Sequence, residues 1–243
     1  MAICYINFYF LEHGIVIIVI LNIRKIMDKG QERVFCIKRT DLEGVFGRSL
    51  PTGAIKGPVV DDILKLEAFF LPRYQAEHDS SYKQIIPYQI FCWDNRFLIY
   101  RRGSGIGEGR LSGCLSAGVG GHINIMDLNE SDKKGSAFYH KALIRERMEE
   151  LSGPAVIEEK FIGWINDETN AVGRVHLGAV HMCKVETRDG FGAKTGEDIH
   201  LAGWWTKEDI FAKKEMFETW SVYAMELFRG PRLDNRKTNP SFS

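Results

Sequence analysis

Three glutamates, Glu146, Glu149 and Glu150, lie within five residues of one another, downstream of two adjacent glycines, Gly120 and Gly121. Residues three and four apart lie on the same side of an α-helix, so a helix here would crowd the carboxylates together. Crowded carboxylates repel one another, but they bind a cation well, because Mg²⁺ prefers hard oxygen ligands. The pattern predicts a magnesium site. The alternative interpretation is a solvated acidic helix face.

The segment 136–151 is predicted to form that helix. Ile144, Met148 and Leu151 are spaced as an apolar stripe, so we expect them to face the core and the glutamates to face away. A glycine-rich stretch, 103–121, and a polar insertion, 127–135, come before the helix.

Segments rich in β-branched and aromatic residues predict a sheet around this helix. Tyr88–Trp93 and Arg96–Arg101 flank the turn-forming pair Asp94-Asn95, which predicts a β-hairpin. Other predicted strands are 34–37, 157–164, 174–185 and 199–205. Helical spacing predicts helices at 61–70, ended by Leu71-Pro72, and at 215–228. Strands on both sides of a helix in mixed order favour an α/β sandwich.

These patterns divide the chain into four parts: an apolar leader (1–26), an N-terminal α/β extension (27–84), a main domain (85–230) and a polar tail (231–243). The leader has three interpretations. It is a membrane anchor, although Glu12 and His13 interrupt the apolar run; it is a buried strand; or it precedes the true start at Met27.

Composition limits the class of protein. Lys+Arg and Asp+Glu both number 32, so the net charge is zero, which argues against bulk binding of nucleic acid. The five cysteines are scattered without the spacing of a zinc site or a disulfide framework. A reducing cytoplasm fits best.

The residues around the glutamates resemble the pattern of the Nudix hydrolase family. That pattern runs Gly, five residues, Glu, seven residues, Arg-Glu, an aliphatic residue, any residue, Glu-Glu, any residue, Gly. Here Gly121 is followed by Asp127 in the first acidic position, and Arg145-Glu146 and Glu149-Glu150 match the two later pairs. The gap before Arg145 is longer by about ten residues. Arg147 replaces the aliphatic residue and Ser152 the last glycine.

A subgroup of phosphoesterases in that family is similar over most of the chain from about residue 30 onward. The similar stretches are Tyr82–Tyr88, Gly120–Asn124, Asn166-Asp167, Val175–Gly178 and Glu218–Ser221. The resemblance implies a Nudix-type α/β/α sandwich with a mixed sheet.

The resemblance also implies an activity: metal-dependent hydrolysis of a diphosphate linkage in a nucleoside-diphosphate-type substrate, with Mg²⁺ or Mn²⁺ as cofactor. Glu146, Glu149 and Glu150 would bind the metal together with the carbonyl of Gly120. Glu146 would also position or deprotonate the attacking water. Arg145 would pair with Asp127 and hold the loop against the helix.

The remaining candidate residues each have two interpretations. Glu197, or Asp198 as a fallback, could supply another metal ligand or could be only a loop carboxylate. Three arginines around the glycine-rich stretch could meet phosphates or could be solvated surface residues: Arg101, Arg102 and Arg110. His122 could touch the substrate or have a structural role, and His176 and His181 are expected at the edge of the core.

The alternative function is a catalytically silent Nudix module that binds a nucleotide and regulates a partner. In either case we expect a small-molecule nucleotide-type ligand and neither nucleic acid nor a membrane as partner. A homodimer remains open.

Overall fold

The computed structural model describes residues 32–102, 113–128, 136–194 and 199–228, and the backbone of two short paired strands, β1 (Tyr9–Phe10) and β2 (Val16–Ile17). The rest of the leader and the polar tail lie outside the described residues. No helix of the described part is long and apolar enough to cross a membrane.

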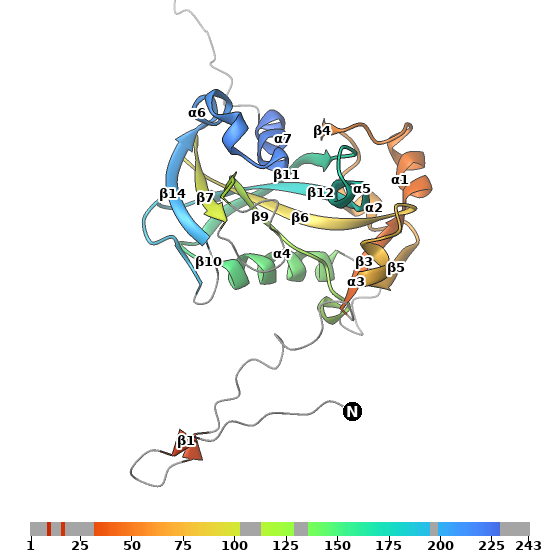
Figure 1. Ribbon diagram of the computed structural model, residues 1–243, viewed down its shortest axis with the longest axis horizontal. Helices are drawn as coiled ribbons and strands as arrows, with labels where there is room; N and C mark the ends of the chain where they lie inside the picture. The colour runs from red at the N-terminus through yellow and green to blue at the C-terminus, as the bar shows by residue number, and fades with distance from the viewer. Residues whose placement is uncertain are drawn as a thin grey trace, which may run out of the picture.

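A mixed, open sheet of ten strands forms the centre of the described chain (Figure 1). Its main path follows the order β14-β7-β6-β12-β11-β4, and only β6 and β12 pair in parallel. The strands on this path are β4 (Gly53–Ile55), β6 (Tyr82–Trp93), β7 (Arg96–Arg102), β11 (Val156–Asn166), β12 (His176–Val185) and β14 (Ile199–Thr206). Two further short strands, β10 (Leu151–Ser152) and β13 (Gly192–Ala193), pair separately.

The long strand β6 organises the sheet. One of its edges pairs with β12 along most of its length. The other edge pairs in turn with three strands, which are β3 (Arg33–Lys38), β9 (Gly118–Gly120) and β7. Two short strands complete the sheet: β5 (Ala68–Pro72) beside β3, and β8 (Leu115–Ser116) beside β7. The extension thus joins the same sheet as the main domain, and the boundary expected at 84/85 falls inside β6.

Helices cover both faces of the sheet (Figure 1). On one face, α4 (Ala137–Glu150) packs Phe138, Tyr139, Ala142 and Leu143 into a cluster with residues of β3, β6 and β12. On the other face lie α6 (Lys207–Ala212) and α7 (Thr219–Leu227). Shorter helices are α1 (Arg39–Phe46), α2 (Val60–Ile63), α3 (Arg73–Ala76) and α5 (Ala171–Val175). This is the predicted α/β/α sandwich.

The predicted hairpin is confirmed. Asp94 (φ 45°) and Asn95 (φ 58°) both adopt the left-handed conformation, and β6 and β7 pair directly on either side of them. Asp and Asn tolerate this region better than other residues, and it matches the twist of a two-residue hairpin.

Two predictions about helices were wrong. The helix expected at 61–70 stops at Ile63, because the apolar run Ala68–Pro72 pairs with β3 and its Phe70 ring packs edge-on against Phe35 at 5.5 Å. The helix at 137–150 is confirmed, but its buried face is not the predicted one. Ile144 is 43% exposed and Met148 60% exposed.

The buried face of α4 instead runs through Tyr139, Ala142 and Leu143. Continued by one helical turn, it reaches Glu146, whose side chain is 14% exposed. An acid on the buried face is costly unless it is paired, so Glu146 needs a specific environment.

Candidate active site

The diglycine corner after β9 lies directly against Glu146. Gly120 is in register with Tyr88 of β6, and a Cβ on Gly120 would lie 2.8 Å from the carbonyl oxygen of Pro87. A Cβ on Gly121 would overlap the carboxylate of Glu146. Glycine at both positions therefore lets the strand approach β6 on one side and the helix carboxylate on the other.

The guanidinium of Arg145 joins the loop to the helix. Its Nε and Nη2 donate to the two carboxylate oxygens of Asp127, at 2.9 and 2.8 Å, so the expected pairing is present. Nη2 also donates to the carbonyl oxygen of His122 at 2.9 Å. Asp127 is 1% exposed, so the two charges compensate each other in the interior.

The same guanidinium draws two of the three acids together. Arg145 Nη1 donates to Glu146 Oε1 at 2.7 Å and to Glu149 Oε2 at 3.3 Å. Two carboxylate oxygens from successive turns of the helix therefore converge on one positive nitrogen.

The pKa of Glu146 is raised to about 7, mainly by burial and also by the nearby carboxylates of Glu149 and Glu32, while Arg145 opposes the shift. Near neutral pH this carboxyl is poised between its two protonation states. Such a group can accept a proton from water. A cation bound next to it would strongly favour its charged carboxylate form.

The donors suit a hard divalent cation in their chemistry: carboxylates on two successive turns and carbonyl oxygens at the corner. The side chains are only partly assembled, however. Glu149 is 55% exposed at its side chain. Within the described ranges, no three Asp, Glu, His or Cys side chains are close enough together to hold a metal ion. The three-acid site stays a prediction.

Of the other sequence candidates, two can be placed. Arg101 is exposed and donates to the carbonyl oxygen of Gly113. His122 faces His176, with the two Nε2 atoms 3.2 Å apart. Four side chains lie outside what the structure describes: Arg102, Arg110, Glu197 and Asp198.

Sequence reasoning missed the residues that support the corner from the extension. Asn124 donates through Nδ2 to Glu32 at 2.7 Å, and Arg73 donates to the second oxygen of Glu32 at 2.9 Å. The backbone N–H of Asn124 also donates to the Asp127 carboxylate, which forms a capping box. The spacing Asn124-x-x-Asp127 is the sequence signal that could have indicated this turn.

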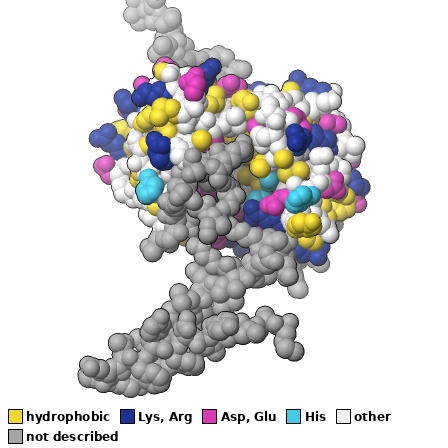
Figure 2. All heavy atoms as spheres, viewed as in Figure 1, with side chains coloured by type: hydrophobic (Ala, Val, Ile, Leu, Met, Phe, Trp, Pro, Cys, Tyr) yellow, Lys and Arg dark blue, Asp and Glu magenta, His cyan; other side chains and the backbone are white. Residues whose placement is uncertain are grey.

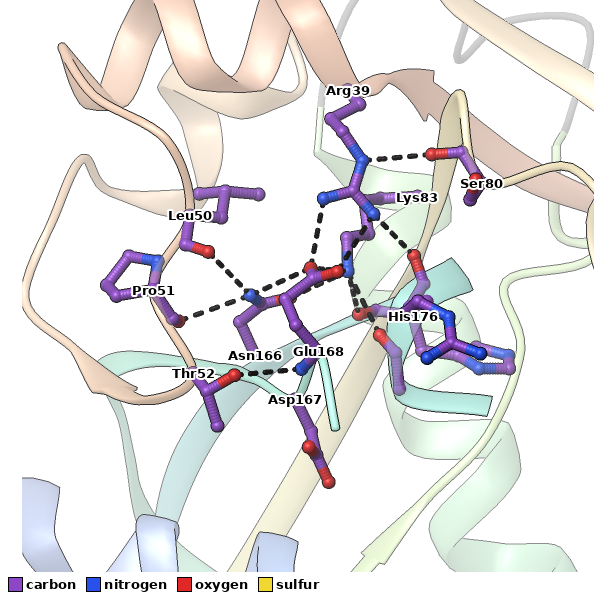
Figure 3. Close-up of polar contacts among 12 residues, drawn as sticks. Arg39, Leu50, Pro51, Thr52, Ser80, Lys83, Asn166, Asp167, Glu168 and His176 are labelled. Atoms are coloured by element: carbon purple, nitrogen blue, oxygen red, sulfur yellow. Dashed lines mark hydrogen bonds and ion pairs between the residues drawn. The ribbon is translucent and has the colours of Figure 1, made fainter. Parts of the chain in front are cut away.

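A second polar cluster joins the extension to the sheet (Figure 3). The fully buried Lys83 donates to Asn166 and Glu168, both at 2.7 Å, and to the carbonyl oxygens of Gly173 and His176. Glu168 also accepts hydrogen bonds from both terminal nitrogens of Arg39 in α1. Burial lowers the pKa of Lys83 to about 8, and Glu168 opposes the shift. This cluster fixes the turn that leads into β12.

Charges of both signs are mixed over the described part of the surface in Figure 2, where Lys and Arg side chains alternate with Asp and Glu. This face carries no single-sign patch in its described part. That agrees with the zero net charge of the sequence.

Two comparisons with known proteins are informative. Protein YmaB of Bacillus subtilis is 29% identical over 180 residues, which are 70% of this chain and 83% of YmaB. The solved structure of Tm1382, named as a candidate Nudix hydrolase, superposes with a TM-score of 0.65 at 28% identity, covering 81% of this chain and 97% of that one. No protein-family model matches the chain.

Proposed function

Because this chain belongs to the Nudix hydrolase family, and so to the enzymes that cleave phosphoric anhydrides, we propose that it hydrolyses a diphosphate linkage in a nucleoside-diphosphate-type substrate with a divalent metal. One observation carries the proposal. The carboxylate of Glu146 lies against the diglycine corner while Arg145 draws Glu149 toward it.

The proposed metal ligands are Glu146, Glu149 and Glu150 with the carbonyl oxygen of Gly120. A bound Mg²⁺ or Mn²⁺ would neutralise charge on the diphosphate and lower the pKa of the attacking water. Glu146 is the proposed proton acceptor, since its carboxylate lies against the diglycine corner where the metal and its water would bind.

Arg145 is a positioning residue in this proposal. Its bonds to Asp127 and to the His122 carbonyl hold the corner and the helix in one arrangement, and its bond to Glu146 Oε1 orients that carboxylate. In the overall reaction, water adds to one phosphorus, the bridging P–O bond breaks, and the proton of the water leaves through Glu146.

Glu149→Gln and Glu150→Gln test the proposal, assayed with Mg²⁺ or Mn²⁺ against nucleotide sugars, dinucleoside polyphosphates, ADP-ribose, NADH and oxidised nucleotides. We expect each variant to fold and to lose at least about 100-fold in turnover. Wild-type rates in both variants would contradict the proposal. Glu158→Gln, an exposed acid on β11, is the matched control.

One observation favours the alternative of a silent nucleotide-binding module: the described side chains do not include an assembled group of three metal ligands. That alternative predicts tight nucleotide binding without product release. The same substrate panel, followed by calorimetry on any ligand that is not hydrolysed, separates the two functions.

A further inference from the structure

Glu32 is an acid of the N-terminal extension that contacts the candidate active site. Its Oε1 accepts a hydrogen bond from Asn124 Nδ2 at 2.7 Å, and its Oε2 accepts one from Arg73 Nη1 at 2.9 Å. The Glu32 side chain is 26% exposed. One carboxylate oxygen is therefore bound to the segment that follows the diglycine corner, and the other is bound to α3.

The backbone on both sides of this contact is held in place. The carbonyl oxygen of Glu32 accepts a hydrogen bond from the Arg73 backbone N–H at 2.6 Å, and β3 begins at the next residue. Val34 of β3 forms an antiparallel bridge with Asn124, and the Phe35 N–H donates to the Ile123 carbonyl oxygen at 2.9 Å. Glu32 thus meets Asn124 from a fixed position.

Asn124 carries the contact into the turn 124–127. Because its Nδ2 is bound to Glu32, its Oδ1 faces the backbone N–H of Met126 and accepts a hydrogen bond at 3.0 Å. The backbone N–H of Asn124 donates to Asp127 Oδ2 at 2.8 Å, and the Asp127 N–H donates back to the Asn124 carbonyl oxygen at 2.9 Å. The orientation of the Asn124 amide therefore affects where Asp127 lies.

Arg145 completes the connection to the proposed metal ligands. The Asp127 oxygen that accepts from Asn124 also accepts from Arg145 Nη2, and Arg145 Nη1 donates to Glu146 Oε1. Glu32 is also within electrostatic reach of Glu146, because the pKa of Glu146 is raised mainly by burial and in addition by the Glu32 carboxylate. A residue of the extension is thus linked to the reacting end of α4.

Glu77 of the same extension provides an internal comparison. Its Oε1 accepts a hydrogen bond from Arg73 Nε at 2.8 Å, so Glu32 and Glu77 share one guanidinium. Among the hydrogen bonds of the described chain, Asn124 is bonded to Glu32 and not to Glu77. If Glu32 served only to hold Arg73 and α3, loss of either acid would have the same effect.

We propose that Glu32 is a positioning residue for the reaction, and that it acts by holding the Asn124 amide and thereby the turn that carries Asp127. The extension is then part of the catalytic unit. The proposal rests on the proposed hydrolysis and deepens it. Residues that orient the ligands of a metal site without touching the metal commonly contribute about 10- to 100-fold to activity or to metal affinity.

The kinetic test compares Glu32→Ala, Glu32→Gln and Glu77→Ala in the full chain, with Mg²⁺ and the substrate that the wild type hydrolyses fastest. Glu32→Ala should lower kcat by about 10- to 100-fold and change KM less than about threefold, because it disturbs the reacting groups and not substrate binding. Glu32→Gln should keep at least about a third of the wild-type kcat, since its amide oxygen still accepts from Asn124. Glu77→Ala should leave kcat unchanged.

Three kinetic results would overturn the proposal. The first is an unchanged kcat in Glu32→Ala. The second is an equal loss in Glu77→Ala, which would assign the effect to Arg73. The third is a Glu32→Gln variant as impaired as Glu32→Ala, which would assign it to the charge and not to the hydrogen bond with Asn124.

Amide hydrogen exchange in EDTA gives a readout that needs neither metal nor turnover. The backbone N–H groups of Met126 and Asp127 are both bonded to Asn124. Glu32→Ala should therefore speed their exchange by about tenfold or more, because the turn opens more easily, and Glu77→Ala should not. Equal exchange in wild type and Glu32→Ala would overturn the proposal even if kcat falls.

The outcomes are separable from the proposed hydrolysis. Hydrolysis by the wild type, with unchanged kcat and exchange in Glu32→Ala, would defeat the positioning role and leave the hydrolase standing. Faster exchange in Glu32→Ala, in a protein that hydrolyses nothing, would defeat the hydrolase and leave Glu32 as the residue that holds this turn.

Discussion

Both carboxylate oxygens of Asp127 accept hydrogen bonds from the guanidinium of Arg145, at 2.8 and 2.9 Å, across a segment that is longer than in the family pattern. The insertion between the two residues therefore leaves their contact intact. The corner and the helix are joined through this pair.

Asp127→Asn should destabilise the fold by about 3 kcal/mol, because it removes the buried carboxylate that accepts hydrogen bonds from both Nε and Nη2 of the partly buried Arg145. For a chain of this size that corresponds to a fall in Tm of roughly 6 to 12 °C. Urea unfolding followed by circular dichroism measures it. Asp189→Asn, at a highly exposed acid, is the control, and equal stability of the two variants would contradict the structural role of the pair.

Gly121→Ala should abolish most activity while the protein still folds. The added methyl overlaps the end of the flexible Glu146 side chain, which must move aside, and a displacement of about 1 Å can cost roughly 100-fold in rate. Steady-state kinetics with Mg²⁺ measure the loss. Gly44→Ala in α1, where a Cβ meets nothing within 4 Å, should keep full activity.

Acidification should destabilise the protein through His176. Its pKa is about 4 in the folded chain and near 6.5 unfolded. Between these values the unfolded chain binds more protons, so this contribution to stability is present above pH 6.5 and lost as the pH falls through 4. His176→Asn keeps a donor for the Val172 carbonyl but does not titrate.

The difference in unfolding free energy between wild type and His176→Asn should therefore shift by up to about 3 kcal/mol between pH 7 and pH 4, against the wild type. Denaturant unfolding at several pH values measures it. A difference that is constant with pH would show that His176 is not held neutral.

Mg²⁺ should raise the Tm of the wild type, because an ion that binds only the folded chain stabilises it. At 100 times its Kd the gain is about 2.7 kcal/mol, or roughly 5 to 10 °C. Glu149→Gln should lose most of the shift, and the exposed control Glu158→Gln should keep it. Equal shifts in all three proteins would place the ion elsewhere.

Local sequence patterns were sufficient to predict several structural features. The β6–β7 hairpin follows from Asp94-Asn95 between two apolar runs, since those residues accept the left-handed conformation. The position of α4 follows from helical spacing, whereas the corner at Gly120-Gly121 and the Asp127–Arg145 pair follow from the resemblance to the family pattern. The family assignment rests on the same residues, and the fold agrees with it.

Other features depended on partners far away in the sequence. Ala68–Pro72 has helical spacing but becomes a strand, because β3 offers it a pairing edge. On α4, two apolar stripes were compatible with the sequence. The stripe that includes Ile144 and Met148 is exposed to solvent. The other stripe, which is followed one turn later by Glu146, is buried against the sheet.

The sequence by itself determined which residues are candidates for the chemistry, because a helical turn and a diglycine corner are set by neighbours along the chain. Only the tertiary structure decided what surrounds them. Gln84 and Gln89 are the same residue type on one strand, yet one amide has a partner and the other has none within the described chain. Strand register and helix packing make that difference, because both bring together segments far apart in sequence.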